Sequence, residues 1–266
     1  MTTILDGKKI AAKILEEVKQ TVAGLSEKPF LSIIRCGEDP ASILYTNMKK
    51  KKAEEIGMKA ELCIFPAEVS EDIIIHYIQQ MNIAADGIIV QLPLPGHLNS
   101  EKILSTIYPE KDVDGLTYHS LFEVFQGNER HAPATPKGVI RLLEEYHISL
   151  AGKHAVVIGR SALIGKPLAM MLLHRDATVS ICHSKTKDLS KHTLQADILI
   201  SAVGKPHFIT ADMVKDGAVV IDVGISQQQG ETKGDIHPEV ISKTSYLAPV
   251  PGGVGPMTIA MLLESV

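Results

Sequence analysis

A tyrosine and a lysine four residues apart, Tyr45 and Lys49, have the clearest chemical potential in this sequence. Asp39 is suited to cap a helix, Pro40 fits the first helical position, and Gly57 offers a left-handed end. On a helix bounded in this way, residues four apart lie on one face, so a phenol and an amine point into the same space. Such a pair can stack a flat substrate and handle its protons.

The spacing also has a plainer interpretation. Residues 49–52 are four consecutive lysines, and such a run is typical of a solvated helix face. Lys52, seven residues after Tyr45, falls on nearly the same face as Lys49. Geometry alone therefore leaves both lysines as equal candidates.

Helix and strand periods alternate along the first part of the chain. The pattern predicts helices over residues 10–25, 40–56 and 70–81, and strands over 30–34, 60–65 and 87–92. Short apolar strands separated by helices imply right-handed crossovers and a mostly parallel sheet.

Turn residues dominate residues 108–136, and we place a domain junction there. A second series follows, with a helix over 137–146 and strands over 155–158, 178–182, 197–202 and 218–222. Residues 227–229, three glutamines, are predicted to be a loop.

We expect an α/β protein of two α/β domains with a cleft between them. The second domain is a Rossmann-like, doubly wound parallel sheet. The first domain spans residues 1–133 and is joined by a C-terminal helix over 256–266, and the second spans 134–255.

A glycine-containing turn in the second series is the candidate nucleotide site. The strand ending at Ile158 runs into Gly159-Arg160-Ser161 and then, from Gly165, into an apolar helix to residue 173. Strand, glycine turn and helix is the context in which a pyrophosphate rests on helix N–H groups. Because Ser161 replaces the middle glycine of G-x-G-x-x-G, the pattern alone fits a plain βαβ turn equally well.

The end of the next strand favours NADP over NAD. NAD sites place a carboxylate there to hold the ribose 2′-hydroxyl, whereas this strand is followed by Ser184 and Lys185, with no carboxylate before Asp188. Together with Arg160, these groups suit a 2′-phosphate, although an ordinary basic loop is the alternative.

Two other strand ends are glycine-rich, Val203-Gly204 and Gly224-Ile225, as is the tail over 249–258.

Composition narrows the class of protein. The chain has 266 residues, 45% hydrophobic and 22% charged, which is normal for a folded protein. A net charge of −4 argues against broad nucleic-acid or anionic-membrane binding. Three cysteines without a C-x-x-C motif, and no signal peptide or long apolar span, favour the cytoplasm. The 11 histidines lack metal-binding spacing, so we expect no metal.

Taken together, these segments closely resemble the bifunctional methylenetetrahydrofolate dehydrogenase/cyclohydrolase family over nearly the whole chain. Six motifs carry the resemblance: Asp39-Pro40-Ala41-Ser42 with Tyr45 and Lys49, Val90-Gln91-Leu92-Pro93-Leu94-Pro95, Lys111-Asp112-Val113-Asp114-Gly115, Thr135-Pro136-Lys137-Gly138, Gly159-Arg160-Ser161, and the tail from Pro249 to Thr258.

The resemblance implies two reactions at one site. NADP accepts hydride from the methylene carbon of 5,10-methylenetetrahydrofolate, and the resulting methenyl cation is hydrolysed to 10-formyltetrahydrofolate. The family's lysine maps to Lys49 rather than Lys52. Tyr45 matches the tyrosine that stacks on folate, Gln91 the glutamine that bonds the lysine, and Asp114 the aspartate that holds the pterin.

The resemblance also gives the wider sets of site residues and a homodimer formed through the second domain. The substrate-binding set is Tyr45, Lys49, Val90, Gln91, Leu92, Asp114, Pro251, Gly252 and Gly253. The cofactor-binding set is Gly159, Arg160, Ser161, Gly165, Ser184, Lys185 and Ile225.

Two other functions remain as alternatives. One is a monofunctional dehydrogenase or cyclohydrolase on the same scaffold, because one site can lose one step. The other is a non-catalytic NADP or folate sensor, against which the intact Tyr45, Lys49, Gln91 and Asp114 argue, since binding alone does not require the lysine.

Overall fold

The computed structural model describes residues 1–228 and 231–266, and the chain divides into two compact units. Unit 1 comprises Met1–Ala12, Val124–Glu129 and Thr135–Thr258. Unit 2 comprises Lys13–Glu123, Arg130–Ala134 and Ile259–Val266. Helices α1 (Gly7–Gly24), α5 (Tyr118–Gln126) and α9 (Val254–Glu264) each contribute residues to both units.

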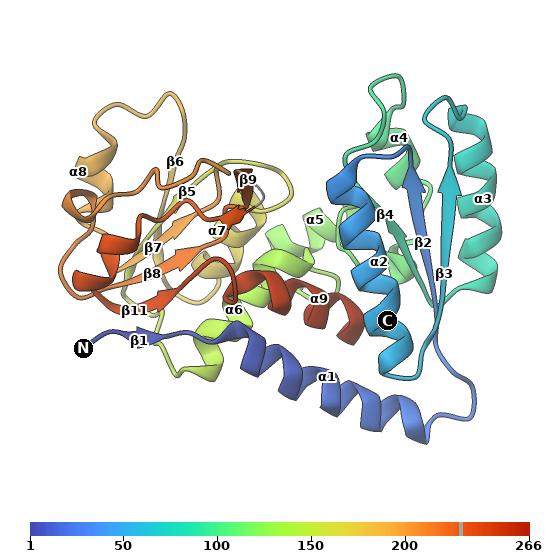
Figure 1. The fold of residues 1–266 in the computed structure, drawn as a ribbon, viewed down its shortest axis with the longest axis horizontal. Helices are drawn as coiled ribbons and strands as arrows, with labels where there is room; N and C mark the ends of the chain where they lie inside the picture. The colour runs from blue at the N-terminus through green and yellow to red at the C-terminus, as the bar shows by residue number, and fades with distance from the viewer. Residues whose placement is uncertain (229–230) are drawn as a thin grey trace. The chain divides into compact units, whose positions relative to one another are not determined.

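Unit 2 is built on a three-stranded parallel sheet in the order β3-β2-β4 (Figure 1). The strands are β2 (Phe30–Cys36), β3 (Lys59–Phe65) and β4 (Gly87–Val90). The chain moves from β2 to one neighbour through α2 (Pro40–Glu55) and then back across β2 through α3 (Glu71–Ala84). Because both crossovers are right-handed, the two helices cover opposite faces of the sheet. All three predicted strands and the mostly parallel sheet are confirmed.

The helix that carries Tyr45 and Lys49 begins and ends as predicted. The Asp39 carboxylate accepts a hydrogen bond of 2.8 Å from Ser42 N, which lowers the pKa of Asp39, and Pro40 is the first helical residue. Such a cap satisfies one of the free N–H groups at the start of the helix. Gly57 has φ of +88°, a conformation that glycine adopts without strain.

Unit 1 contains a six-stranded sheet in which every pair is parallel, in the order β1-β11-β8-β7-β5-β6. Its strands are β1 (Thr3–Ile4), β5 (His154–Ile158), β6 (Thr178–Cys182), β7 (Ile198–Ser201), β8 (Ala218–Asp222) and β11 (Thr244–Ala248). From β5 the chain goes to β6 on one side through α7 (Gly165–Leu173) and returns to β7 on the other through α8 (Leu189–Thr193). The sheet is therefore doubly wound, with its switch point between β5 and β7.

Several elements were not predicted. Strands β1 and β11 lengthen the sheet of unit 1, and α5 lies within the segment predicted to consist of turns. Helix α6 (Ala134–Glu145) begins earlier than expected. Shorter helices occur at α4 (Ser100–Leu104), η1 (Pro109–Lys111), η2 (Ala211–Met213) and η3 (Pro238–Ser242).

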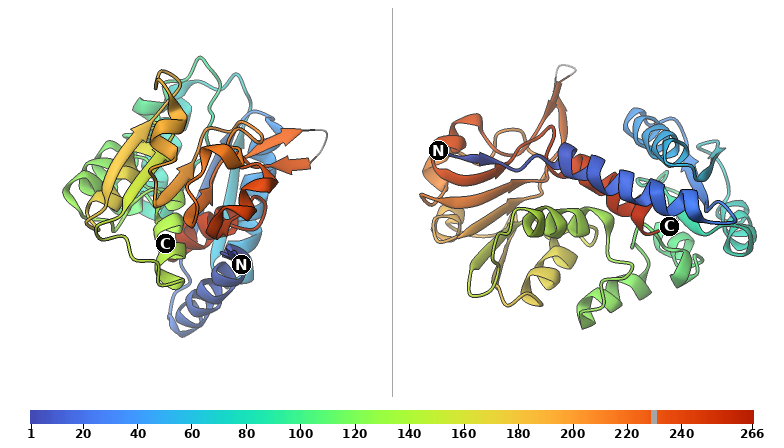
Figure 2. Two further views of the ribbon diagram at one scale, coloured as in Figure 1. Left: turned by 90° about the vertical axis from the view of Figure 1, so that its left-hand side faces the viewer. Right: turned by 90° about the horizontal axis from the view of Figure 1, so that it is seen from below.

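The loop predicted over residues 227–229 is wrong at two of its three positions. Gln227 and Gln228 belong to β9 (Ser226–Gln228), which pairs antiparallel with β10 (Glu231–Lys233), and Gln229 lies outside the described residues. These two strands extend away from the six-stranded sheet (Figure 2). The cross-strand bond from Gln227 Nε2 to Thr232 Oγ1, 2.9 Å, shows why polar residues form strands here.

Two buried carboxylates meet where β8 ends. Asp222 accepts hydrogen bonds from the backbone N–H groups of Asp235 and Ile236, each 2.9 Å. Burial raises the pKa of Asp222 from 3.8 to about 7, and the neighbouring Asp235 carboxylate adds to this, against the backbone bonds that lower it. A group whose pKa is raised on folding stabilises the folded protein. This contribution is fully present when the pH is below the pKa of the group in the unfolded chain, and it is lost as the pH rises through the pKa in the folded protein.

We therefore expect the free energy of unfolding to fall by about 2 kcal/mol from about pH 5 to about pH 7.5 through this group alone. Asp222→Asn removes the titration, so urea melts of the variant should show a flatter pH dependence, whatever its absolute stability. Asp216→Asn, at an exposed carboxylate paired with Lys243, is the control and should keep the slope of the unchanged protein. Equal slopes for the protein and Asp222→Asn would contradict the expectation.

Candidate active site

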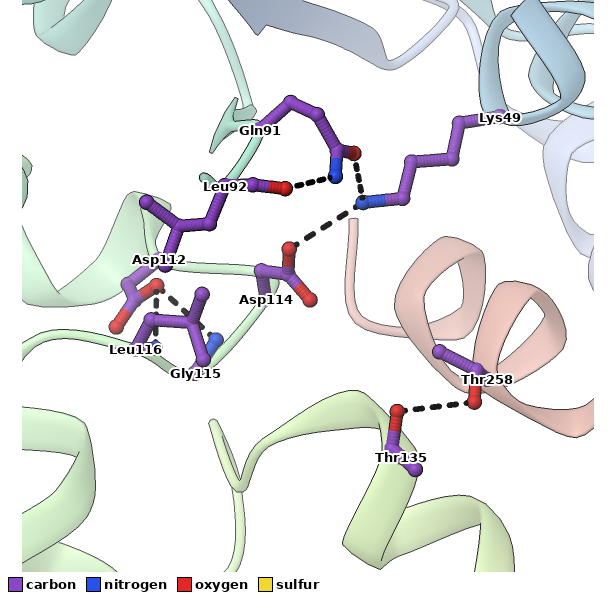
Figure 3. A network of polar contacts seen from close by, with 9 residues as sticks. All are labelled: Lys49, Gln91, Leu92, Asp112, Asp114, Gly115, Leu116, Thr135 and Thr258. Carbon is purple, nitrogen blue, oxygen red and sulfur yellow. Dashed lines mark hydrogen bonds and ion pairs between the residues drawn. The ribbon is translucent and has the colours of Figure 1, made fainter. Parts of the chain in front are cut away.

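Lys49 lies on the buried face of α2. The buried residues of this helix are Ser42, Thr46, Lys49 and Ala53, spaced so that they form one stripe. Only 7% of Lys49 is exposed. Its Nζ lies 3.2 Å from Gln91 Oε1 and 3.4 Å from Asp114 Oδ2 (Figure 3). The three residues that the sequence predicted to act together are thus in contact.

The other lysines of the run face away from this contact. Lys50 pairs with Glu54, and Lys51 and Lys52 pair with Glu55 on the same helix, in the last case at 2.6 Å. These partly exposed pairs are the solvated helix face that a lysine run suggests. Burial thus separates Lys49 from Lys52, which helical spacing did not.

Gln91 follows β4 directly, and its side chain is oriented by the backbone. Its N–H donates to Ile34 O at 2.9 Å, continuing the ladder of β2 and β4. Its Nε2 donates to Leu92 O at 2.7 Å (Figure 3). Because the amide nitrogen is held there, the amide oxygen faces the Lys49 amine. Val90 is buried and Leu92 is partly buried on either side, so Gln91 is the residue of this motif that reaches the amine.

Asp114 stands in a loop that another aspartate shapes. Asp112 is buried and accepts four hydrogen bonds, from the N–H groups of Gly115, Leu116 and Thr117 and from the Ser120 hydroxyl, at 2.6 to 3.1 Å. Figure 3 shows the first two of these bonds beside Asp114. This role of Asp112 was not predicted from the sequence, although Asp112 lies in one of the six motifs. The aspartate three residues before a glycine was the available signal.

Glycine is required at the turn of this loop. Gly115 has φ of +70°, and a Cβ there would lie 2.5 Å from the backbone of residues 131–133. The loop therefore approaches that backbone too closely for any side chain. Asp114 is held on a rigid turn, with its carboxylate toward Lys49.

Tyr45 lies one turn before Lys49 on α2 and is half-buried. Burial raises the pKa of its phenol, so the ring is neutral at ordinary pH. A neutral aromatic ring suits stacking on a flat heterocycle. In the described part of unit 2, Tyr45, Lys49, Gln91 and Asp114 combine an aromatic surface, an amine, an amide and a carboxylate.

The remaining residues predicted to bind folate, Pro251, Gly252 and Gly253, belong to unit 1. Gly252 O accepts a hydrogen bond of 3.0 Å from Lys8 N. A Cβ on Gly7 would lie 1.8 Å from Gly253 O, so the loop packs directly on the start of α1. The loop over residues 251–253 is therefore described within unit 1, and the Lys49 contact within unit 2.

The predicted cofactor turn joins β5 to α7 in unit 1. A Cβ on Gly159 would lie 2.6 Å from Ala202 O, and one on Gly165 would lie 2.1 Å from Gly159 O. The Ser161 hydroxyl accepts from the N–H groups of Ile164 and Gly165, at 3.1 and 3.4 Å, and keeps its own proton to donate. The turn has the tight glycine packing that a pyrophosphate site needs.

The charged groups near this turn suit an additional phosphate. Arg160, Ser184 and Lys185 are all exposed, and within the described residues no carboxylate forms an ion pair with Arg160 or Lys185. The turn after β6 is held by bonds from Thr186 N to His183 O and from Lys185 N to His183 Nδ1. Ile225, after β8, is 41% exposed and offers an apolar surface.

Metal-binding clusters and membrane-spanning helices can be assessed for residues 1–228 and 231–266. Within them, no three His, Cys, Asp or Glu side chains are grouped so that they could hold a metal ion. None of the helices described there combines the length and apolarity needed to cross a bilayer.

Two family models match the chain. The model described as "Tetrahydrofolate dehydrogenase/cyclohydrolase, catalytic domain" matches residues 5–114, and the model described as "Tetrahydrofolate dehydrogenase/cyclohydrolase, NAD(P)-binding domain" matches residues 133–266. The first contains Lys49, Gln91 and Asp114, and the second contains the turn at Gly159.

Similar proteins cover the chain almost completely. The bifunctional protein FolD of Moorella thermoacetica is 50% identical over 270 residues, covering 98% of this chain and 96% of the relative. A crystal structure of the bifunctional enzyme from Campylobacter jejuni has a TM-score of 0.97 at 45% identity and covers 100% of this chain and 97% of that one. A Trypanosoma brucei enzyme, solved with NADP and an inhibitor, has a TM-score of 0.94 at 34% identity, covering 99% and 95%.

These matches agree with the six motifs quoted above. The chain belongs to the tetrahydrofolate dehydrogenase/cyclohydrolase family.

Proposed function

We propose that this protein oxidises 5,10-methylenetetrahydrofolate to the methenyl form with NADP and hydrolyses that product to 10-formyltetrahydrofolate. The observation that carries the proposal is the contact of the buried Lys49 amine with Gln91 and Asp114. The curated relatives are named as bifunctional proteins, and the Trypanosoma brucei enzyme was solved with NADP, which supports both activities and the cofactor.

Tyr45 and Asp114 are suited to hold the folate. The half-buried ring of Tyr45 stacks on a flat ring system. The Asp114 carboxylate accepts hydrogen bonds from the N–H and amino groups of a pterin, and charge makes these bonds stronger than neutral ones. Val90, Leu92 and the backbone of residues 251–253 complete the proposed substrate-binding set.

Lys49 is suited to transfer the protons of hydrolysis. Water adds to the methenyl carbon and loses one proton, which leaves a hydroxyl group on that carbon. The hydroxyl then loses its proton to become the formyl carbonyl while the bond from the carbon to N5 breaks and N5 takes up a proton. A group that accepts and returns these protons must lie within hydrogen-bond reach of the reacting atoms, and the Lys49 amine is suited to this role. Gln91 orients the amine without adding charge.

The described residues of unit 1 fit NADP. When bound, it supplies the acceptor for the hydride that leaves the methylene carbon. The close packing at Gly159 and Gly165 brings the start of α7 against the end of β5, and the Ser161 hydroxyl can donate to a pyrophosphate bound there. Arg160, Ser184 and Lys185 are suited to bind the 2′-phosphate, and Ile225 is suited to contact an apolar part of the cofactor.

The wider assignments are proposals as well. We propose that residues 134–255 form the NADP-binding domain, and that residues 1–133 with the C-terminal helix form the folate-binding domain. A cytoplasmic location is supported by the three free thiols, Cys36, Cys63 and Cys182. The family resemblance supports a homodimer, which sedimentation of the purified protein tests.

Replacing the buried amine should separate catalysis from binding. We expect Lys49→Met to reduce hydrolysis of methenyltetrahydrofolate by at least about 100-fold, because general acid–base catalysis contributes about that much or more. Folate binding, measured by fluorescence titration, should persist. Lys52→Met removes a neighbouring lysine on the same helix and should stay within about two-fold of the original rate. Near-normal hydrolysis by Lys49→Met would exclude Lys49 from the proposed role.

An assay of the unsubstituted protein with 5,10-methylenetetrahydrofolate and NADP distinguishes the alternative functions. Absorbance reports formation of reduced nicotinamide and decay of the methenyl form separately. A monofunctional enzyme would show one signal, and a sensor would show neither while still binding NADP or folate.

Arg160→Ala should reduce the preference for NADP over NAD. Loss of a charged hydrogen bond to the 2′-phosphate should raise the KM for NADP about ten-fold or more, while the KM for NAD stays nearly constant. Lys153→Ala is the matched control, because it removes an exposed positive charge just before β5, at the opposite edge of the sheet. If Arg160→Ala weakened both cofactors equally, recognition of the 2′-phosphate by Arg160 would be refuted.

A further inference from the structure

Asp235 is a fully buried carboxylate that the proposed reaction does not use. It is 0% exposed and accepts three hydrogen bonds from the end of β7 and the loop after it. Ser201 Oγ and Val203 N donate to Oδ2 at 2.7 and 2.8 Å, and Lys205 N donates to Oδ1 at 2.7 Å. All three donors belong to the segment that leaves the carboxyl end of β7.

The backbone around Asp235 is fixed to the end of β8. Asp235 N and Ile236 N donate to the two oxygens of Asp222, which is the last residue of β8. Asp235 O also accepts from Ile209 N at 2.9 Å. Asp235 therefore holds the β7 loop with its side chain while β8 holds its backbone.

Two glycines leave the space that these carboxylates fill. A Cβ on Gly224 would lie 2.0 Å from Asp235 Oδ1, and a Cβ on Gly234 would lie 1.9 Å from Asp222 Oδ2. Gly224 N also donates to Ser201 O at 3.2 Å. The loops after β7 and β8 are thus packed on the carboxylate pair with no room for a side chain.

This cluster borders the proposed cofactor turn. Ala202, between Ser201 and Val203, carries the carbonyl oxygen that lies against Gly159. The switch point of the sheet lies between β5 and β7, where an α/β sheet binds its ligand. If the pyrophosphate binds at the end of β5 and the 2′-phosphate binds to the residues after β6, the nicotinamide half of the dinucleotide lies over the ends of β7 and β8.

We propose that Asp235 is a positioning residue for the nicotinamide half of NADP. This proposal rests on the proposed function, because it assumes that NADP is the ligand of unit 1. By accepting three bonds at once, Asp235 sets the position of the β7 loop relative to the β8 loop. The nicotinamide half binds to the surface that these two loops form together.

Asp235→Asn tests the role with little change in shape. The amide replaces one acceptor oxygen by a donor, which must face a backbone N–H or the Ser201 hydroxyl. Calorimetry should show NADP binding weakened about ten-fold or more, while 2′,5′-ADP, which has only the adenosine half, binds within about two-fold of the original affinity. Glu231→Gln, an exposed carboxylate on β10, is the control and should change neither affinity.

A comparison of the two activities gives a second readout. The dehydrogenase rate of Asp235→Asn should fall about ten-fold or more, whereas the cyclohydrolase rate, which needs Lys49 and no NADP, should stay within about two-fold. Ser201→Ala removes one bond of the three and should show the same pattern with a smaller loss, even if Asp235→Asn does not fold.

Three results would overturn the proposal. The first is that a folded variant loses affinity for NADP and for 2′,5′-ADP equally. The second is that the dehydrogenase and cyclohydrolase rates fall equally. The third is that NADP binding is unchanged in both Asp235→Asn and Ser201→Ala. Failure of the proposed function is a separate result, because the unsubstituted protein would then neither bind NADP nor turn over folate.

Discussion

The fold of unit 2 depends on satisfying one buried ammonium group. A lysine that is 7% exposed is costly unless its charge is paired and its N–H groups have acceptors. The Gln91 oxygen and the Asp114 carboxylate provide both, and each is itself held by other bonds: Gln91 by Leu92 O, and the Asp114 loop by Asp112. A strand end, a helix face and a tight turn are thus fixed around one amine, which prepares it to act on a bound substrate.

Both units use the same physical device to shape a loop: a buried aspartate that accepts several hydrogen bonds. Asp112 accepts four hydrogen bonds and Asp235 accepts three, mostly from backbone N–H groups. A buried carboxylate with several acceptor positions can hold several amides of a turn at once. Glycines occur beside both loops because a Cβ would clash, with the backbone of residues 131–133 at Gly115 and with the buried carboxylates at Gly224 and Gly234. Neither role was predicted, since it depends on contacts and not on exposure or reactivity, although the spacing of Asp112 before Gly115 was a local signal.

Much of the fold was predictable because the apolar strands are short, regular and separated by clear helix signals. Strands β6 and β8 were predicted at their observed bounds, and α2 followed from Asp39, Pro40 and Gly57. Strands β1 and β11 were missed because they are defined by pairing with distant residues, which a local pattern does not reveal. Spacing could not separate Lys49 from Lys52, because the choice depends on which side of α2 packs on the sheet. The resemblance pointed to Lys49, and the structure shows it buried and Lys52 paired with Glu55.

The central claim is that the Lys49 amine is directed at the one-carbon bridge of a bound folate. A crystal structure with a folate analogue and NADP tests this most directly. We expect Lys49 Nζ to keep its contact with Gln91 and to lie within hydrogen-bond reach of the bridge, directly or through one water. The Tyr45 ring should stack on the analogue. A structure in which the amine turns into bulk solvent while both ligands are bound would contradict it.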